Sequence, residues 1–411
     1  MRLVRMFALA AILVSLFAAS VLADNSERIY GRITTVDGDE FEGYIRWDKN
    51  EGAWVDYLNG NKDLHRSNKS HRRRYSDRKK KITIFGIPIG YSSTLDYYTG
   101  SAQCGVRFGH MLSIEVIDDD AVLITLKSGR ELELESGSTD IGTNIRELVI
   151  EDPVEGEIEF EWDDIESIEF KQGGSSDVSS FGKRLFGTVV TRRGDEFSGW
   201  ICWDIDETFS KDVIDGKEKG RNREIKFENI REIHRRNSSS ADLILVNGKE
   251  ITLRGTNDVD SSNRGIVVTD LDLGEVVIRW KDFESLQLHS SAPVVRYDDF
   301  DGGDRLRGTV YTEDGDQYSG QIRWDDDEEY TWELLDGNYR DIEFNIEFGN
   351  IAEIHKKGSR SAIVILKDGR TFRLRGSNDV DGDNKGIFIE TVAGDEEEIY
   401  WEDFEKVIFG R

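Results

Sequence analysis

The sequence predicts an all-β protein in which one small β unit is repeated six times. First, an apolar spacing, Φ-x-Φ-x-x-Φ-x-x-Φ, recurs at 106–114, 160–168, 225–233, 278–286, 346–354 and 399–407. Second, the segments 185–288 and 306–409 align without a gap, and Trp203 matches Trp324. Third, no run keeps a helical apolar stripe for three turns. Such self-similarity is typical of proteins built from tandem modules.

Three modules follow from these repeats, and they are assigned in chain order to 24–170, with an insertion at about 61–105, to 185–288 and to 306–411. The segments 171–184 and 289–305 connect them. Both connecting segments contain paired glycines, which are typical of linkers.

Each module carries its strand signals twice, once in each half-unit. In module 2, Phe197, Gly199, Ile201 and Trp203 alternate with other residues after the turn glycine Gly194, which is the pattern of a half-buried strand after a hairpin turn. The recurring apolar spacing is typical of a strand, a tight 3₁₀-like turn and a last short strand. Half-units of this length are marginal alone, so we expect the two of each module to be small open barrels that pack together.

Four of these stretches are similar to segments of a known family. They are Thr191-x-x-Gly194-Asp195-x-Phe197-x-Gly199-x-Ile201, Leu366-Lys367-Asp368-Gly369-Arg370-x-Phe372, Ile278-x-Trp280-x-Asp282-Phe283 and Phe160-x-Trp162-Asp163-Asp164-Ile165. The first two resemble the strand pair of Sm-like and SH3-like small β-barrels, and the last two resemble their closing strand and 3₁₀ turn. The chain is also similar to uncharacterised exported bacterial repeat proteins, through segments like 253–259 and 263–266. The resemblance implies six SH3-like or Sm-like half-units with a binding or scaffolding role. The RNA-binding signature of true Sm proteins is not recognisable.

The first residues predict export. Arg2 and Arg5 precede an uncharged apolar run over 6–21. This run is followed by the small residue Ala23, directly before Asp24. This is the pattern of a signal peptide at 1–23, so the mature protein is expected in a periplasm or outside the cell. The alternative is a membrane anchor, for which the run is short. No transmembrane segment is expected in the mature chain.

The charge limits the partners. The chain has 82 acidic and 54 basic residues, a formal net charge of −28. Such a chain repels nucleic acid and anionic lipid, and it favours cations or basic proteins. Only Cys104 and Cys202 are present, in different repeats, and we expect no disulfide between them.

Two kinds of acidic loop recur and are candidates for binding a hard cation. One follows the core tryptophan, at 203–207 and 324–329. The other supplies the candidate metal ligands, which are Asp258, Asp260, Asp379, Asp381 and Asp383. Carboxylate and amide oxygens suit Ca²⁺, which makes weak calcium binding one interpretation. The alternative is that Asp and Asn stand there because they fold turns by hydrogen-bonding their own backbone.

The insertion in module 1 holds a dense basic block. Its candidate partner-binding residues are Arg72, Arg73, Arg74, Lys79, Lys80 and Lys81. Such a block suits an acidic protein or a phosphate-bearing envelope polymer. It is equally compatible with a solvated loop without specificity.

No motif specifies a reaction. The sequence has no Gly-x-Ser-x-Gly elbow, phosphate-binding glycine loop, Cys-x-x-Cys or His-Glu-x-x-His. We therefore expect a non-enzymatic exported binding or scaffold protein of the bacterial envelope or extracellular space, multivalent through its modules and without an obligatory cofactor. The alternatives are a carbohydrate-active or other hydrolase that uses the acidic loops, and a weakly calcium-binding adhesion-type protein.

Overall fold

The computed structural model describes residues 26–63, 81–84, 87–91, 101–174, 179–391 and 393–410. Here the protein is all-β, as predicted: its named strands pair antiparallel, and its only helical elements are 3₁₀ turns of three residues. No helix within these ranges is long and apolar enough to cross a membrane. The predicted signal peptide, 1–23, lies outside the described residues.

Module 1 forms a ten-stranded sheet in the order β11-β10-β2-β1-β12-β7-β8-β9-β3-β6, and β4 and β5 form a separate hairpin. Its elements are β1 (Tyr30–Thr35), β2 (Glu40–Trp47), β3 (Tyr57–Asp63), β4 (Lys81–Ile84), β5 (Ile87–Tyr91), β6 (Ser101–Arg107), η1 (Phe108–His110), β7 (Met111–Asp118), β8 (Ala121–Leu126), β9 (Glu131–Glu135), β10 (Leu148–Asp152), β11 (Gly156–Glu159), η2 (Trp162–Asp164) and β12 (Ile165–Phe170). Because β3 pairs with β6, the insertion is an enlarged connection within one hairpin.

Module 2 contributes eight strands to a second sheet, in the order β19-β18-β17-β22-β13-β14-β20-β21, and a separate hairpin of β15 and β16. Its elements are β13 (Phe186–Thr191), β14 (Glu196–Trp203), β15 (Val213–Glu218), β16 (Arg221–Lys226), η3 (Phe227–Asn229), β17 (Ile230–Asn237), β18 (Ser240–Leu245), β19 (Glu250–Arg254), η4 (Asn257–Val259), β20 (Ile266–Asp270), β21 (Gly274–Ile278) and β22 (Phe283–Leu288). The linker to module 3 contains η5 (Tyr297–Asp299).

Module 3 repeats the plan in an eight-stranded sheet, β29-β28-β27-β32-β23-β24-β30-β31, while its hairpin of β25 and β26 joins the sheet of module 2. Its elements are β23 (Arg307–Thr312), β24 (Gln317–Trp324), β25 (Leu334–Tyr339), β26 (Ile342–Glu347), η6 (Phe348–Asn350), β27 (Ile351–Lys356), β28 (Ala362–Leu366), β29 (Thr371–Leu374), η7 (Asn378–Val380), β30 (Ile387–Thr391), β31 (Glu396–Ile399) and β32 (Phe404–Phe409).

The two half-units of a module exchange strands. In module 2 the opening strands β13 and β14 pair with β22 and β20, which belong to the second half-unit. The closing strand of the first half, β17, pairs with β18 because only two residues separate them, so a tight hairpin forms locally. Neither half-unit, as the sequence delimits it, is therefore a self-contained sheet.

Glycines within strands mark a close backbone approach. A β-carbon on Gly199 would lie 2.2 Å from the carbonyl oxygen of Thr269 on the paired strand β20, and Gly43 and Gly320 occupy the same position in the other modules. Any larger residue here would force the two strands apart.

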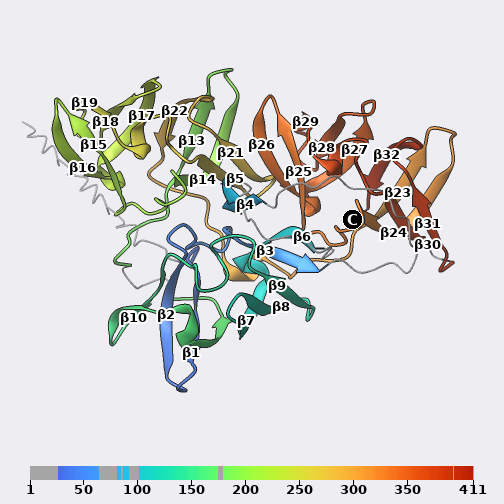
Figure 1. Ribbon diagram of the computed structural model, residues 1–411, viewed down its shortest axis with the longest axis horizontal. Helices are drawn as coiled ribbons and strands as arrows, with labels where there is room; N and C mark the ends of the chain where they lie inside the picture. The colour runs from blue at the N-terminus through green and yellow to red at the C-terminus, as the bar shows by residue number, and fades with distance from the viewer. Residues whose placement is uncertain are drawn as a thin grey trace, which may run out of the picture.

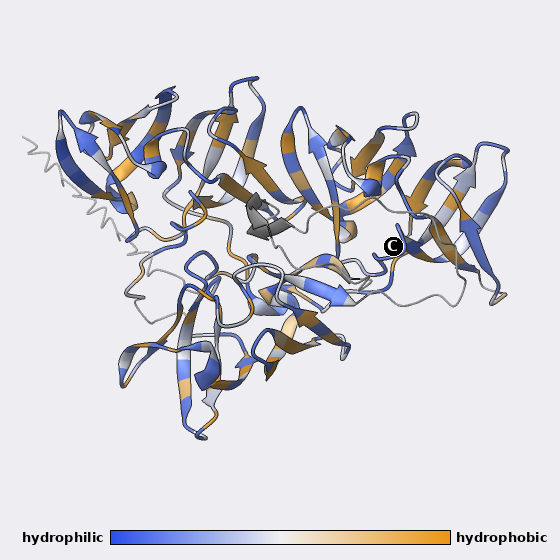
Figure 2. Ribbon diagram, viewed as in Figure 1, coloured by the Kyte–Doolittle hydropathy of each residue, from blue (hydrophilic) through white to orange (hydrophobic). Residues whose placement is uncertain are grey.

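Hydrophobic and hydrophilic residues alternate along the strands (Figure 2), and the apolar faces form the core. One cluster of buried side chains runs through modules 2 and 3 together, and a second fills module 1 and includes Tyr297 of the linker and Trp332 of module 3. Cys104 belongs to the module 1 cluster and Cys202 to a small separate one, and both are buried thiols.

Modules 2 and 3 lie in one row, and module 1 lies beside that row (Figure 1). β21 of module 2 pairs with β26 of module 3, which continues one sheet across the junction. Module 1 is attached through buried charge: Arg107 Nε lies 2.6 Å from Glu347 Oε2 of module 3, and Arg107 Nη2 donates to the Asp270 carbonyl of module 2.

Candidate cation site

Each module gathers three carboxyl groups beside its core tryptophan, all of them buried except Glu207, which is half-buried. We call these groups the carboxylate clusters, and they are Asp48, Glu51 and Asp140 in module 1, Asp204, Glu207 and Asp258 in module 2, and Asp325, Glu328 and Asp379 in module 3. In modules 1 and 2 one oxygen of each carboxyl lies within 4.8 Å of the others. The two acidic loops that the sequence shows separately therefore meet at one place in the fold.

A tight loop after the tryptophan positions the first two carboxyls. In module 2, Trp203 and Glu207 exchange two backbone hydrogen bonds of 2.8 and 3.0 Å. The loop turns between them because Asp204 and Ile205 adopt left-handed backbone angles, with φ of 52° and 61°. The aspartate and the glutamate thus point to the same side. The equivalent loops of modules 1 and 3 have the same two backbone hydrogen bonds.

The second acidic loop brings in the third carboxyl. Trp203 Nε1 donates to the Asp258 carbonyl at 3.0 Å, and the Asp215 amide of β15 donates to Asp258 Oδ2 at 2.7 Å. The same pair of bonds recurs at Asp140 and at Asp379. The tryptophan side chain therefore holds the loop, and the aspartate ties the loop to the neighbouring hairpin.

One arginine serves each of the first two clusters. Arg264 donates from its amide to Asp204 Oδ1 at 2.5 Å, and its Nη2 lies 3.0 Å from Asp204 Oδ2. Arg146 holds Asp48 in the same way, and both arginines also contact Asp206, which links the clusters of modules 1 and 2. Each of these two clusters thus has three carboxyl groups and one guanidinium.

Module 3 differs because Lys385 takes the place of the arginine and a second lysine lies beside the cluster. Lys385 Nζ lies 3.4 Å from Asp325 Oδ2 and 3.7 Å from Asp327 Oδ1. Lys62, from module 1, donates to the Asp327 carbonyl and to the Glu333 carboxylate. The third cluster is therefore more nearly neutralised by the protein's own cations.

One glutamate oxygen in each cluster has no hydrogen-bond partner among the described residues, and these atoms are Glu51 Oε2, Glu207 Oε2 and Glu328 Oε2. Asp140 Oδ1 is unpartnered as well, and the side chains of Glu51 and Asp140 have an exposed fraction of zero. A buried carboxylate oxygen without a partner is costly, so such an atom requires a proton or a cation.

The electrostatics point the same way. Burial, with the nearby carboxylates Asp258 and Asp206, raises the pKa of Glu207 to about 10. Burial and the Asp140 carboxylate raise the pKa of Glu51 well above its usual range. Burial also raises the pKa of Asp258 to about 7. At neutral pH each glutamate holds a proton unless a positive ion replaces it.

The predicted metal ligands divide into two groups. Asp258 and Asp379 lie in the clusters, whereas Asp260 and Asp381 accept hydrogen bonds from the backbone two residues further on, as turn-forming aspartates do. Asp383 is exposed. The metal-ligand prediction omitted the aspartate and glutamate after the tryptophan, although a Trp-Asp-x-x-Glu spacing recurs in all three modules and was a usable signal.

The predicted partner-binding residues Arg72, Arg73, Arg74, Lys79 and Lys80 lie outside the described residues. Lys81 begins strand β4.

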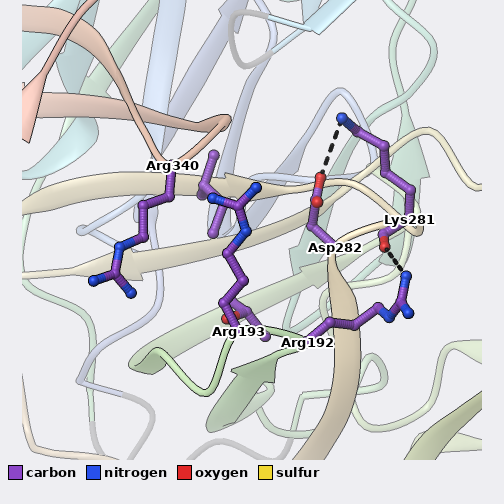
Figure 3. A pocket seen from close by; sticks show the side chains of 7 residues that line it. Arg192, Arg193, Lys281, Asp282 and Arg340 are labelled. Carbon is purple, nitrogen blue, oxygen red and sulfur yellow. Dashed lines mark hydrogen bonds and ion pairs between the residues drawn. The ribbon is translucent and has the colours of Figure 1, made fainter.

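A shallow pocket at the junction of modules 2 and 3 gathers basic side chains instead (Figure 3). Its lining includes Arg192, Arg193, Lys281 and Arg340. Two of them pair with acidic residues across the junction: Arg340 Nη1 lies 2.9 Å from Asp195 Oδ1, and Arg193 Nη2 lies 3.3 Å from Asp341 Oδ2. The pocket is thus an edge of the module junction.

Comparison with family models, curated proteins and solved structures found no match.

Proposed function

We propose that the chain is a non-enzymatic exported scaffold or binding protein in which modules 1 and 2 are each braced by a divalent cation such as Ca²⁺. The observation that carries this proposal is the buried, unpartnered glutamate oxygen that faces two aspartates in each of these modules. Carboxylate oxygens are the ligands that Ca²⁺ prefers. The cation would be held by Asp48, Glu51 and Asp140 in module 1, and by Asp204, Glu207 and Asp258 in module 2.

The position of the clusters suits a structural role. Each one joins the loop after the tryptophan, the loop before β20 or its counterpart β10, and the neighbouring hairpin. A cation there would cross-link three segments that are distant in sequence. Binding would therefore add directly to the stability of the folded module.

The same burial argues against hydrolysis. A glycosidase needs two carboxyl groups on either side of a bond in an accessible cleft. The three carboxyl residues of module 1 have no exposed surface, and Asp204 is equally buried. A polymer chain has no path to these groups in this state, which favours the scaffold over the hydrolase.

The test is calcium binding to the full mature chain, measured by equilibrium dialysis and by melting temperature. We expect two cations per chain, falling to one in Glu51→Gln and in Glu207→Gln. Glu328→Gln is the matched control from module 3 and should leave two. A second control, Glu284→Gln, changes an exposed glutamate of β22. A melting temperature that does not respond to millimolar Ca²⁺, together with no bound calcium, would overturn the proposal.

A further inference from the structure

Several strands of the row formed by modules 2 and 3 have an edge without a partner strand among the described residues, and two of them matter here. The first is β31, which ends the sheet of module 3, and the second is β16, which pairs only with β15. They lie at opposite ends of the row (Figure 1). A row with an unpaired edge at each end can be extended by another copy.

The junction inside the chain shows how such a contact is made. β21 pairs antiparallel with β26, and Gly274 faces Ile346 while Val276 faces Phe344. At the corner, Arg340, which lines the pocket in Figure 3, forms an ion pair with Asp195. All five residues of β21, which lies between β20 and β26, are buried.

The free edges are the repeat counterparts of the two strands in that junction. The gapless alignment of modules 2 and 3 matches β31 to β21 and β16 to β26. Glu396, Glu397 and Glu398 of β31 are exposed, as are the first four residues of β16. The two ends of the row thus carry counterparts of the two strands that pair at the internal junction.

We propose that the protein associates head to tail with a second copy of itself, with β31 of one copy pairing antiparallel with β16 of the next in the register of β21 and β26. This inference rests on the scaffold role proposed above and names its partner. It is independent of the cation sites.

Charge is complementary at one facing pair of the two edges and at the corner, whereas Glu396 would face Glu224. In the internal register, Glu397 of one copy faces Arg223 of the next, where the chain itself places Val276 against Phe344. The corner ion pair is also retained, because Asp316 stands at the position of Asp195 and Lys219 at the position of Arg340.

We expect this contact to be weaker than the internal one, because an ion pair takes the place of an apolar pair. Opposite charges that face each other across strands are favourable, but solvent and salt screen them. Arg223 already lies 2.9 Å from Glu218 in an exposed ion pair, which contributes little and can be exchanged. The association should therefore be reversible and sensitive to salt.

β11 is the counterpart of β21 and β31 in module 1, and it is a poorer partner for β16. It is also acidic, but the residue that would face Arg223 is Ile158. β11 therefore provides the matched control for a charge change on β31.

The experiment is sedimentation velocity of the full mature chain over a range of concentrations. At about 50 mM NaCl we expect concentration-dependent growth into linear oligomers, which dissociate at about 500 mM NaCl. Glu397→Lys and Arg223→Glu should each weaken the association about tenfold. A chain that carries both changes restores the ion pair and should recover it. Glu157→Lys, on β11, should have no effect.

The outcomes separate this inference from the proposed function. A chain that stays monomeric at low salt, or oligomers that ignore both charge reversals, would overturn the head-to-tail contact. Repeating the series with Ca²⁺ and with a chelator reports on the cation sites independently. An association that changes in Glu157→Lys and does not change in Glu397→Lys would assign the contact to module 1 instead.

Discussion

Replacing Glu207 with glutamine should remove a pH dependence of stability that the buried carboxyl imposes. Burial and neighbouring carboxylates raise the pKa of Glu207 to about 10 in the folded protein, against about 4.3 in an unfolded chain. The folded state therefore keeps a proton that the unfolded state releases. The contribution of Glu207 to the stability of the cation-free protein is full below about pH 4.3, falls as pH rises to about 10, and is constant above that range.

The magnitude follows from the retained proton. One proton held throughout an interval changes the free energy of unfolding by about 1.4 kcal/mol per pH unit. Between pH 6 and pH 8 the wild type should thus lose about 2.7 kcal/mol relative to Glu207→Gln, whose amide does not titrate. Because the glutamate is protonated over this range, both chains present a neutral side chain to Asp204 and Asp258. The other titrations cancel in the difference.

Urea unfolding in a chelator, followed by tryptophan fluorescence at pH 6, 7 and 8, measures this difference. The infrared band of a protonated carboxyl group, present at pH 7 and reduced in the variant, reports the proton directly. Saturating Ca²⁺ should stabilise the wild type by about 2.7 kcal/mol at a hundredfold excess over Kd, and the variant by less. Parallel pH profiles for the two chains would refute the reasoning, because they would show that Glu207 ionises normally.

Three further outcomes are expected from the packing. Arg107→Gln should lower the free energy of unfolding by about 3 to 5 kcal/mol in urea titrations, because it leaves the Glu347 carboxylate buried without its main partner; a loss below about 1 kcal/mol would contradict this. Gly199→Ala should cost about 1 to 3 kcal/mol by the same assay, since its β-carbon would meet the Thr269 carbonyl oxygen; unchanged stability would show that the strands can separate freely. Burial raises the pKa of the Cys104 thiol to about 12, so at pH 8 its thiolate is roughly a thousandfold scarcer than that of an unfolded cysteine; equal reaction rates with a thiol reagent before and after unfolding would be inconsistent with this burial.

The all-β class was predictable because the signals for it are local. The alternation from Phe197 to Trp203 and the turn glycine Gly194 specify a strand and a hairpin without reference to the rest of the chain, and the structure has both in β13 and β14. The closing motif likewise contains its own 3₁₀ turn, seen at Phe227–Asn229.

The exchange of strands between half-units was not predictable from these signals. Both hairpins of a module carry the same alternation, so the pattern fits either closing strand equally well. The choice depends on chain connection, because Asn237 and Ser240 are close enough to form a hairpin that occupies the edge of β17. This choice of strand partner depends on the spatial arrangement, so the apolar periodicity of the sequence does not reveal it.

The sequence predicted the candidate site only in part. Both acidic loops could be recognised, but each cluster takes two carboxyls from the loop after the tryptophan and one from the other loop, while Asp260 and Asp381 form turns. The spacing from Trp203 to Glu207 would have singled out the correct residues, because a tryptophan that ends a buried strand fixes which following carboxyl turns inward. The contribution of Lys62 to module 3 depends on how modules pack, which no single repeat contains.

Residues at equivalent positions of the repeats differ where one strand is covered at a module junction and its counterpart is not. Val276 and Val277 of β21 are apolar because β26 covers them, while their counterparts Glu397 and Glu398 lie on an open edge. Charge on an open edge discourages pairing with unrelated strands. It also admits a strand of opposite charge in the right register, and the basic edge of β16 is such a strand within the same chain. The same glutamates can therefore keep the protein from aggregating and still select a second copy of it, which is the combination that a reversible linear scaffold requires.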